Sequence, residues 1–237
     1  MPQKTNKISC EECTTTSCFV KKTNPEWLAK ISEFKNQVVY PKGQYIFSEG
    51  SPVFGAYFIQ SGDVKIVSSS FSGRQNIVRL AKNGHMMGHK GVAKENYPIG
   101  AVALNDARVC FLNNELLYDA FLNNTHFTIE IMMFYSKELR KSEMRNKFFA
   151  QMTTDEKVAY AIVYAGEIVG QKNNKGQIMI TLSRQELAQI AGTNAEQVSR
   201  TISHMKNDGL LSLDGRCICI DNLPGVYNLL SEYEQFI

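Results

Sequence analysis

The sequence has no long apolar run. No stretch of the 237 residues approaches the ~18 consecutive apolar residues that a membrane-spanning helix needs. The N-terminus, MPQKTNKISCEEC, also has no apolar core of the kind found in a secretory signal peptide. With 43% hydrophobic residues, the chain can bury a sizeable core in one or two domains. We therefore expect no membrane contact and a location in the cytoplasm.

Motifs of hydrolytic enzymes are also missing. Only His85 and His89 are spaced as H-x3-H, across Gly88, no histidine pair shows the H-E-x2-H spacing of a zinc hydrolase, and no serine lies in a G-x-S-x-G turn. A metal enzyme built on a cupin-like barrel would need clustered histidine and carboxylate ligands, which this sequence does not offer. We expect no catalytic residues and no enzymatic activity.

Neither charge sign is in large excess. The net charge is only +3, and residues 153–237 carry 7 basic and 10 acidic side chains. Total charge therefore gives no support for nucleic-acid binding. The affinity of a DNA-binding protein depends instead on where its few phosphate contacts lie.

The order of residue patterns predicts an α+β protein. Short alternating runs punctuated by glycine fill residues 38–117 and predict an antiparallel sandwich or small barrel. Glycine and proline are then absent from 123–152, where we expect one long helix. Another helix is predicted over 153–169, followed by a polar loop and a short strand.

The long helix carries a repeating stripe that favours a seam with a second copy of the chain. A helix that packs on its own sheet would show a similar stripe, so both readings stay open. The stripe has i, i+3, i+7 spacing and consists of Met132, Tyr135, Leu139, Ser142, Asn146 and Phe149.

Residues 183–209 read as two short helices joined by a tight turn at Gly192. The pairs Ser183/Glu186 and Thr193/Glu196 both fit the S/T-x-x-E capping pattern that begins a helix. Each helix has one apolar stripe, so the two should pack together. The alternating segment LLSLDGRCICIDN then predicts a β-hairpin, or wing, beside them.

The exposed face of the second helix carries side chains that can read DNA bases. Arginine binds guanine with two hydrogen bonds and glutamate accepts from the amino group of cytosine, and such contacts suit Arg200 and Glu196. In the alternative reading, Glu196 only closes its own cap and pairs with Arg200 at i,i+4. The further candidates for DNA contacts are Ser199, Arg184, His204, Lys206 and Arg216.

A glycine-punctuated β-roll, a long helix and a winged helix-turn-helix with E-x-x-S-R together resemble the Crp/Fnr family of bacterial transcription regulators. The resemblance implies a cyclic-nucleotide-binding-like β-roll, or double-stranded β-helix, then a dimerisation helix and a DNA-binding domain. It also implies a homodimer on a palindromic promoter site and RNA polymerase as a partner. The expected divisions are a cysteine-rich segment 1–22, the β-roll 23–122, the dimerisation helix 123–152 and the DNA-binding domain 153–237.

Within that family the second helix is similar to the Fnr branch. The Crp branch has an extra arginine before the glutamate and a glycine in place of the serine, where this chain has Ala195 and Ser199. The resemblance implies a TTGA-like half-site with Arg200 on guanine, Glu196 on the cytosine side and Ser199 near the outer thymine.

Cyclic AMP is not expected as the effector. Cyclic-nucleotide members of the family supply a glutamate for the ribose and an Arg-Ser pair for the phosphate. Here the glutamate position is His89, and the Arg-Ser position falls near Ile99 and Gly100, so no cation is placed to neutralise a phosphate. Lys90 and Lys94 are interpreted as solvated loop lysines.

Four cysteines are the candidate metal ligands. Cys10, Cys13 and Cys18 form C-x2-C-x4-C, and Cys110 lies alone in a later strand pattern. In a cytoplasmic protein this pattern favours metal ligation over disulfides, and thiolates suit both iron-sulfur clusters and zinc. The resemblance to Fnr-type oxygen sensors implies an iron-sulfur cluster, although the second gap is four residues and the best-known pattern has five.

Other readings of the sensor remain open. The β-roll could bind a small organic effector, or the regulator could need no cofactor. His85 and His89 could hold haem but are interpreted as loop residues. Cys217 and Cys219 alternate with isoleucines in the hairpin and are interpreted as packing residues.

Overall fold

A computed structural model describes residues 3–4, 7–70, 73, 75–88 and 95–233. The chain divides into two compact units, residues 1–137 and residues 138–237, with the boundary inside the long helix. In the described part of the chain, no helix is both long and apolar enough to cross a membrane.

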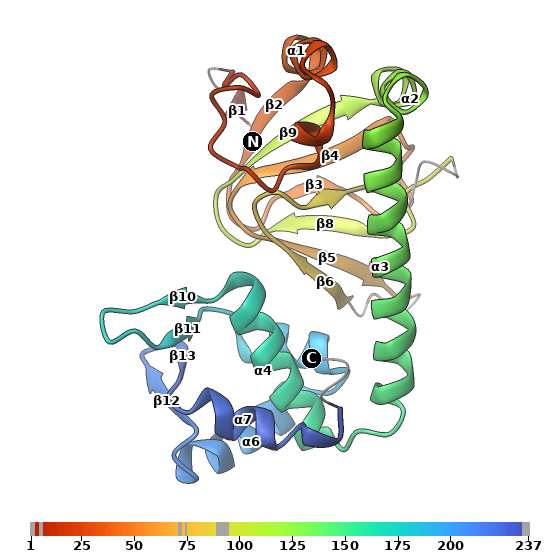
Figure 1. Cartoon of the computed structure of the whole chain (residues 1–237). Coiled ribbons are helices and arrows are strands. Elements are labelled where there is room, and N and C mark those ends of the chain that lie inside the picture. The colour runs from red at the N-terminus through yellow and green to blue at the C-terminus, as the bar shows by residue number, and fades with distance from the viewer. Residues whose placement is uncertain (1–2, 5–6, 71–72, 74, 89–94, 234–237) are drawn as a thin grey trace. The chain divides into compact units, whose positions relative to one another are not determined.

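Two antiparallel sheets form the centre of the first unit (Figure 1). One has the strand order β1-β2-β9-β4-β7 and the other β3-β8-β5-β6, as expected for a β-roll. Buried residues such as Ile59 and Ile66 lie between them. The strands are β1 (Gln3–Lys4), β2 (Asn36–Tyr40), β3 (Tyr45–Phe47), β4 (Gly55–Ser61), β5 (Val64–Ser69), β6 (Gln75–Ala81), β7 (Met86–Met87), β8 (Gly100–Ala103) and β9 (Ala107–Asn113).

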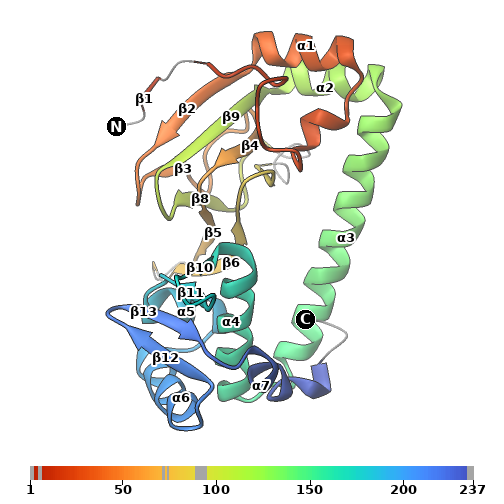
Figure 2. The same ribbon diagram turned by 60° about the vertical axis from the view of Figure 1, so that its left-hand side comes forward.

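Helices cover one end of the larger sheet. α1 (Pro25–Phe34) and α2 (Asn114–Asn123) pack against each other there, and the short 3-10 helix η1 (Phe19–Lys22) precedes them (Figure 2). α1 was not predicted from the sequence, although its start is readable: Asn24 accepts a hydrogen bond from the Trp27 N–H at 2.9 Å, and Pro25 is the first helical residue.

The long helix is shorter than predicted. α3 runs over Thr125–Phe149 rather than 123–152, and a non-helical Asn124 separates it from α2. The prediction that strands continue to Leu117 is wrong, because Asn113 accepts from the Leu116 N–H at 2.9 Å and starts α2.

The second unit combines helices with a small sheet in the order β10-β11-β13-β12. The predicted helix after residue 152 is present, and a capping box between Thr153 and Glu156 begins it. The short strand predicted after it is half of a hairpin, β10–β11. The elements are α4 (Thr154–Val169), β10 (Gln171–Lys172), β11 (Ile178–Ile180), α5 (Arg184–Ala191), α6 (Ala195–Asn207), β12 (Leu211–Asp214), β13 (Cys217–Ile220), α7 (Leu223–Asn228) and the 3-10 helix η3 (Ser231–Tyr233).

Candidate DNA-reading helix and cysteine pocket

The first helix of the helix-turn-helix, α5, is capped as the sequence predicts. Ser183 Oγ accepts from the Glu186 N–H at 3.2 Å, and the Glu186 carboxylate accepts from the Ser183 N–H at 2.9 Å. α5 ends at Gly192, whose φ of 68° is a left-handed conformation that favours glycine. The apolar stripes predicted for both helices are buried, so α5 and α6 pack together: Leu187, Ile190, Ala191, Val198, Ile202 and Met205.

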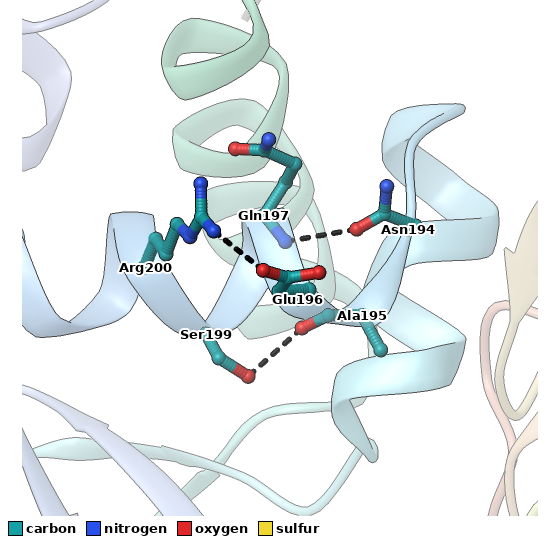
Figure 3. A network of polar contacts seen from close by, with 6 residues as sticks. All are labelled: Asn194, Ala195, Glu196, Gln197, Ser199 and Arg200. Carbon is teal, nitrogen blue, oxygen red and sulfur yellow. Dashed lines mark hydrogen bonds and ion pairs between the residues drawn. The ribbon is translucent and has the colours of Figure 1, made fainter.

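The predicted cap of the second helix is wrong by one residue. α6 begins after Asn194, not Thr193, and the Asn194 side chain accepts from the Gln197 N–H at 2.9 Å (Figure 3). Asparagine is as good an N-cap as serine. The carboxylate of Glu196 is therefore not used for capping.

Glu196 and Arg200 lie together on the exposed face of α6. Their side chains form an ion pair of 2.5 Å across one helical turn, and they are 71% and 62% exposed (Figure 3). Because both are accessible, the pair costs little to separate. The neighbouring Ser199 Oγ donates to the Ala195 carbonyl at 2.8 Å, within the helix.

A buried contact fixes α6 on α4. Thr201 is 3% exposed, and its hydroxyl is hydrogen-bonded to the Asp155 carboxylate. The Thr201 hydroxyl also lies 3.1 Å from the Gln197 carbonyl. The exposed side chains of α6 thus project from a helix whose opposite face is anchored.

The other predicted DNA contacts surround this helix. His204 and Lys206 are exposed on α6, and Arg216 is exposed in the wing. Arg184 is half-buried at the start of α5 and donates to the Arg216 carbonyl at 3.4 Å. Burial lowers the pKa of Arg184 from its ordinary value.

The predicted wing is the hairpin of β12 and β13. Asp214 pairs with Cys217, so the loop residues are Gly215 and Arg216. Gly215 has a φ of 57°, the positive value that hairpin loops take from glycine. Cys219 is buried and Cys217 half-buried in β13, in agreement with a packing role.

The predicted seam residues differ in their surroundings. Met132, Tyr135 and Leu139 are 65%, 38% and 62% exposed on α3. Ser142 and Asn146 are exposed as well. Phe149 is only half-exposed and packs edge-on against Tyr160 of α4, with ring centroids 5.2 Å apart.

The four cysteines predicted as ligands line one pocket. Cys10, Cys13 and Cys18 come from the segment before α1, and Cys110 comes from the middle of β9. Cys110 lies between its register partners Gln37 of β2 and Phe58 of β4. All six cysteines of the chain are free thiols.

Two nitrogen donors point at the sulfur atoms. Lys35 is 3% exposed, and its Nζ lies 3.1 Å from Cys10 Sγ. Gln37 is 7% exposed and donates from Nε2 to Cys110 Sγ at 3.3 Å. Neither residue was predicted from the sequence, because no spacing links them to the cysteines. The only available signal was a lysine directly before a strand and a glutamine two residues later within it.

The pocket shifts the pKa values of its thiols in different directions. Burial raises the pKa of Cys18 to about 12 and also raises the pKa of Cys110, although Gln37 and Lys35 act against the latter shift. Burial would also raise the pKa of Cys13, but hydrogen bonds from Thr15 and the charge of Lys21 outweigh it, so the net pKa is lowered.

Within the described residues, no three His, Cys, Asp or Glu side chains stand close enough to hold a single metal ion. Four thiols around one pocket nevertheless suit a larger metal-sulfur group, because its ligands stand farther apart than those of one ion.

The cysteine segment also touches the long helix. Phe19, next to Cys18, packs against Phe134 of α3 with ring centroids 5.0 Å apart. Lys22 Nζ lies 3.9 Å from the Glu130 carboxylate of the same helix.

The predicted nucleotide positions are only partly described. His89, Lys90 and Lys94 lie outside the described residues. Gly100 is buried in β8, and Ile99 packs on the core of the β-roll. Neither residue has a charged side chain that could bind a phosphate. His85 is half-buried before β7.

Comparisons with known proteins agree with this architecture. A cyclic nucleotide-binding domain matches residues 37–124, and a Crp-like helix-turn-helix domain matches residues 156–229. The chain is 25% identical to the transcriptional activator protein Anr of Pseudomonas protegens, covering 89% of this chain and 88% of Anr. It is 23% identical to the fumarate and nitrate reduction regulatory protein of Salmonella typhimurium, covering 91% and 87%. The solved structure of FixK2 from Bradyrhizobium japonicum is similar, with a TM-score of 0.71, 23% identity, and coverage of 82% of this chain and 96% of FixK2.

Proposed function

The chain belongs to the Crp/Fnr family of DNA-binding transcription regulators, and we propose that it acts as a homodimer on a TTGA-like palindrome under control of a cysteine-ligated iron-sulfur cluster. The proposed iron-sulfur cluster rests on one observation: a single pocket is lined by Cys10, Cys13, Cys18 and Cys110.

Base reading is assigned to the first turns of α6. We assign Arg200 to guanine, Glu196 to the cytosine side and Ser199 to the outer thymine preference. The exposure of Glu196 and Arg200 supports this assignment, as does the cap at Asn194, which leaves the Glu196 carboxylate available to a base. The absence of an arginine at Ala195 favours the Fnr-type half-site over the Crp type.

Phosphate contacts are assigned to basic residues around that helix. Lys206 and His204 extend along α6, while Arg216 projects from the wing and Arg184 lies at the start of α5. Such contacts position the protein on the duplex but do not read its sequence.

A palindrome requires two reading helices, and the exposed stripe of α3 supports a second copy as the partner. Met132, Tyr135 and Leu139 are large apolar or aromatic residues left exposed on one helix, and Ser142 and Asn146 continue the stripe. Phe149 is proposed at its end, where its ring also packs against Tyr160. We also propose RNA polymerase as a partner, because promoter-bound regulators contact it. The proposed location is the cytoplasm, because promoter DNA lies there in bacteria.

The residues of the pocket fit an iron-sulfur cluster. Its donor set is four thiols, and Lys35 and Gln37 place N–H groups on two of the sulfur atoms. When bound, the cluster supplies a redox-sensitive centre. Zinc would use the same thiolates, so the two metals are outcomes of the test below. Cyclic AMP is not proposed, because Ile99 and Gly100 replace the residues that would bind its phosphate.

The cysteine segment contacts the helix that we propose to form the dimer, so ligation of the cysteines can affect dimerisation. Cys18 is followed by Phe19, whose ring rests on Phe134, and Phe134 is next to Tyr135 of the seam. Ligation of Cys18 would fix Phe19 against α3 and so favour one arrangement of the seam. A bias of a few kcal/mol between two states is sufficient for such control.

The proposal is tested by measuring DNA binding of protein purified without oxygen, before and after exposure to air. We expect tight, salt-dependent binding of a TTGA palindrome that weakens after air exposure, together with loss of iron. Binding that is equal in both states, with no iron present, would contradict redox control and leave an organic effector or a constitutive regulator.

A further inference from the structure

Lys35 is a buried cation whose position is fixed by the backbone. Its N–H donates to the Ile31 carbonyl at 2.9 Å and so closes α1, and β2 begins at the next residue. The side chain is 3% exposed and reaches Cys10 Sγ at 3.1 Å. The ammonium group therefore faces the cysteine pocket, without access to bulk water.

No carboxylate balances this charge in the described part of the chain. The ion pairs found there do not include Lys35, and the residues that line the pocket include Lys21 and Lys35 but neither aspartate nor glutamate. A buried ammonium group without an anionic partner is costly. Its natural partner here is a set of thiolates.

Gln37 adds a second donor from the same side. It lies two residues after Lys35, which directly precedes β2, and side chains two residues apart along an extended backbone lie on the same side. Its Nε2 is 3.3 Å from Cys110 Sγ and 3.1 Å from Gln60 Oε1, while its Oε1 accepts from the Ile8 N–H at 2.7 Å. Cys10 and Cys110 thus each have one N–H donor.

We propose that Lys35 is the charge-balancing and positioning residue of the metal-thiolate group, with Gln37 as the accompanying neutral donor. This inference rests on the proposed function. Four thiolates give a bound cluster a net negative charge, and the Lys35 ammonium group at Cys10 offsets it. Positive charge and N–H···S hydrogen bonds favour the more reduced, more negative state, so Lys35 raises the reduction potential of the cluster and slows its loss.

The experiment compares wild type with Lys35→Met, which keeps the length and removes the charge, and Lys35→Arg, which keeps the charge. Lys42→Met is the matched control, because Lys42 is an exposed lysine of the same unit and is not among the residues that line the pocket. Each protein is reconstituted with iron and sulfide without oxygen. The readouts are the rate at which a ferrous-iron chelator removes iron, the midpoint potential, and the free energy of unfolding of the metal-free chain.

For Lys35→Met we expect about tenfold faster iron release or more, because a hydrogen bond to a charged group is lost. We also expect a lower potential and a metal-free chain at least as stable as wild type. Lys35→Arg and Lys42→Met should stay close to wild type in release rate.

Three results would overturn the role of Lys35 while leaving the cluster intact. They are unchanged release and potential in Lys35→Met, an equal effect of Lys42→Met, and equal destabilisation of the loaded and metal-free chains. Wild type without iron and sulfide would instead contradict the proposed cofactor itself, and the inference with it. If Lys35→Met does not fold, Lys35→Leu, which also lacks the charge and the N–H donor, replaces it with the same expectations.

Discussion

The ring of Phe19 meets the ring of Phe134 edge-on, with centroids 5.0 Å apart and planes inclined by 63°. Phe19 follows a candidate metal ligand, and Phe134 belongs to the helix proposed to pair with a second copy. Aromatic pairs of this kind contribute about 0.5–1.5 kcal/mol beyond the area they bury.

Phe19→Ala should therefore separate cofactor binding from dimerisation. We expect iron content to stay near that of wild type while the dimer of the loaded protein weakens by about 1 kcal/mol or more. Sedimentation of the anaerobic protein measures this. Phe54→Ala is the control, because Phe54 is 65% exposed in the same unit. Equal dimerisation of Phe19→Ala and wild type would show that the ring contact does not couple the two.

Arg200→Ala should lose discrimination at the guanine of the half-site. The expected cost is about 1–3 kcal/mol for the TTGA palindrome and little for an unrelated duplex. Fluorescence anisotropy at two salt concentrations measures both affinities. Lys175→Ala, in an exposed loop of the same unit, controls for loss of charge. If the affinity of Arg200→Ala for the palindrome equals that of wild type, the assignment of Arg200 is wrong.

Asn194→Ala should destabilise the second unit by about 1 kcal/mol, because it removes the acceptor for the Gln197 N–H. Thr193→Ala, one residue earlier, should have a much smaller effect. Urea unfolding followed by circular dichroism compares the two. A larger loss in Thr193→Ala would restore the cap predicted from the S/T-x-x-E pattern.

Leu139→Glu should convert the proposed dimer to a monomer, since it replaces an apolar side chain of the proposed seam with a charged one. The same substitution at Leu122, which is 82% exposed on α2, should leave the dimer intact. Light scattering after gel filtration gives the mass of each. A dimeric Leu139→Glu protein would place the interface elsewhere.

The sequence predicted those elements whose local chemistry is unambiguous. The capping box at Ser183, the Asp-Gly turn of the wing and the buried stripes of α5 and α6 all formed as expected. Prediction failed where two local signals compete: Asn194 and Thr193 are both good caps, and only the packed helix selects one.

Site residues that are brought to the pocket only by tertiary contacts could not be predicted from the sequence. The three clustered cysteines were readable as candidate ligands from their spacing, and Cys110 was added to them by the resemblance to Fnr-type sensors. Lys35 has no such pattern; it meets Cys10 only because α1 ends there and β2 begins. The contact between Phe19 and Phe134 likewise arises from packing over a long sequence separation.

The most direct test is the iron and acid-labile sulfide content of the chain reconstituted without oxygen, in wild type, Cys110→Ala and Cys217→Ala. Cys217 is a half-buried cysteine outside the pocket and serves as the matched control. We predict iron and sulfide in wild type and Cys217→Ala, and their loss in Cys110→Ala. Wild type without sulfide, or equal contents in all three proteins, would contradict a cluster held by Cys10, Cys13, Cys18 and Cys110.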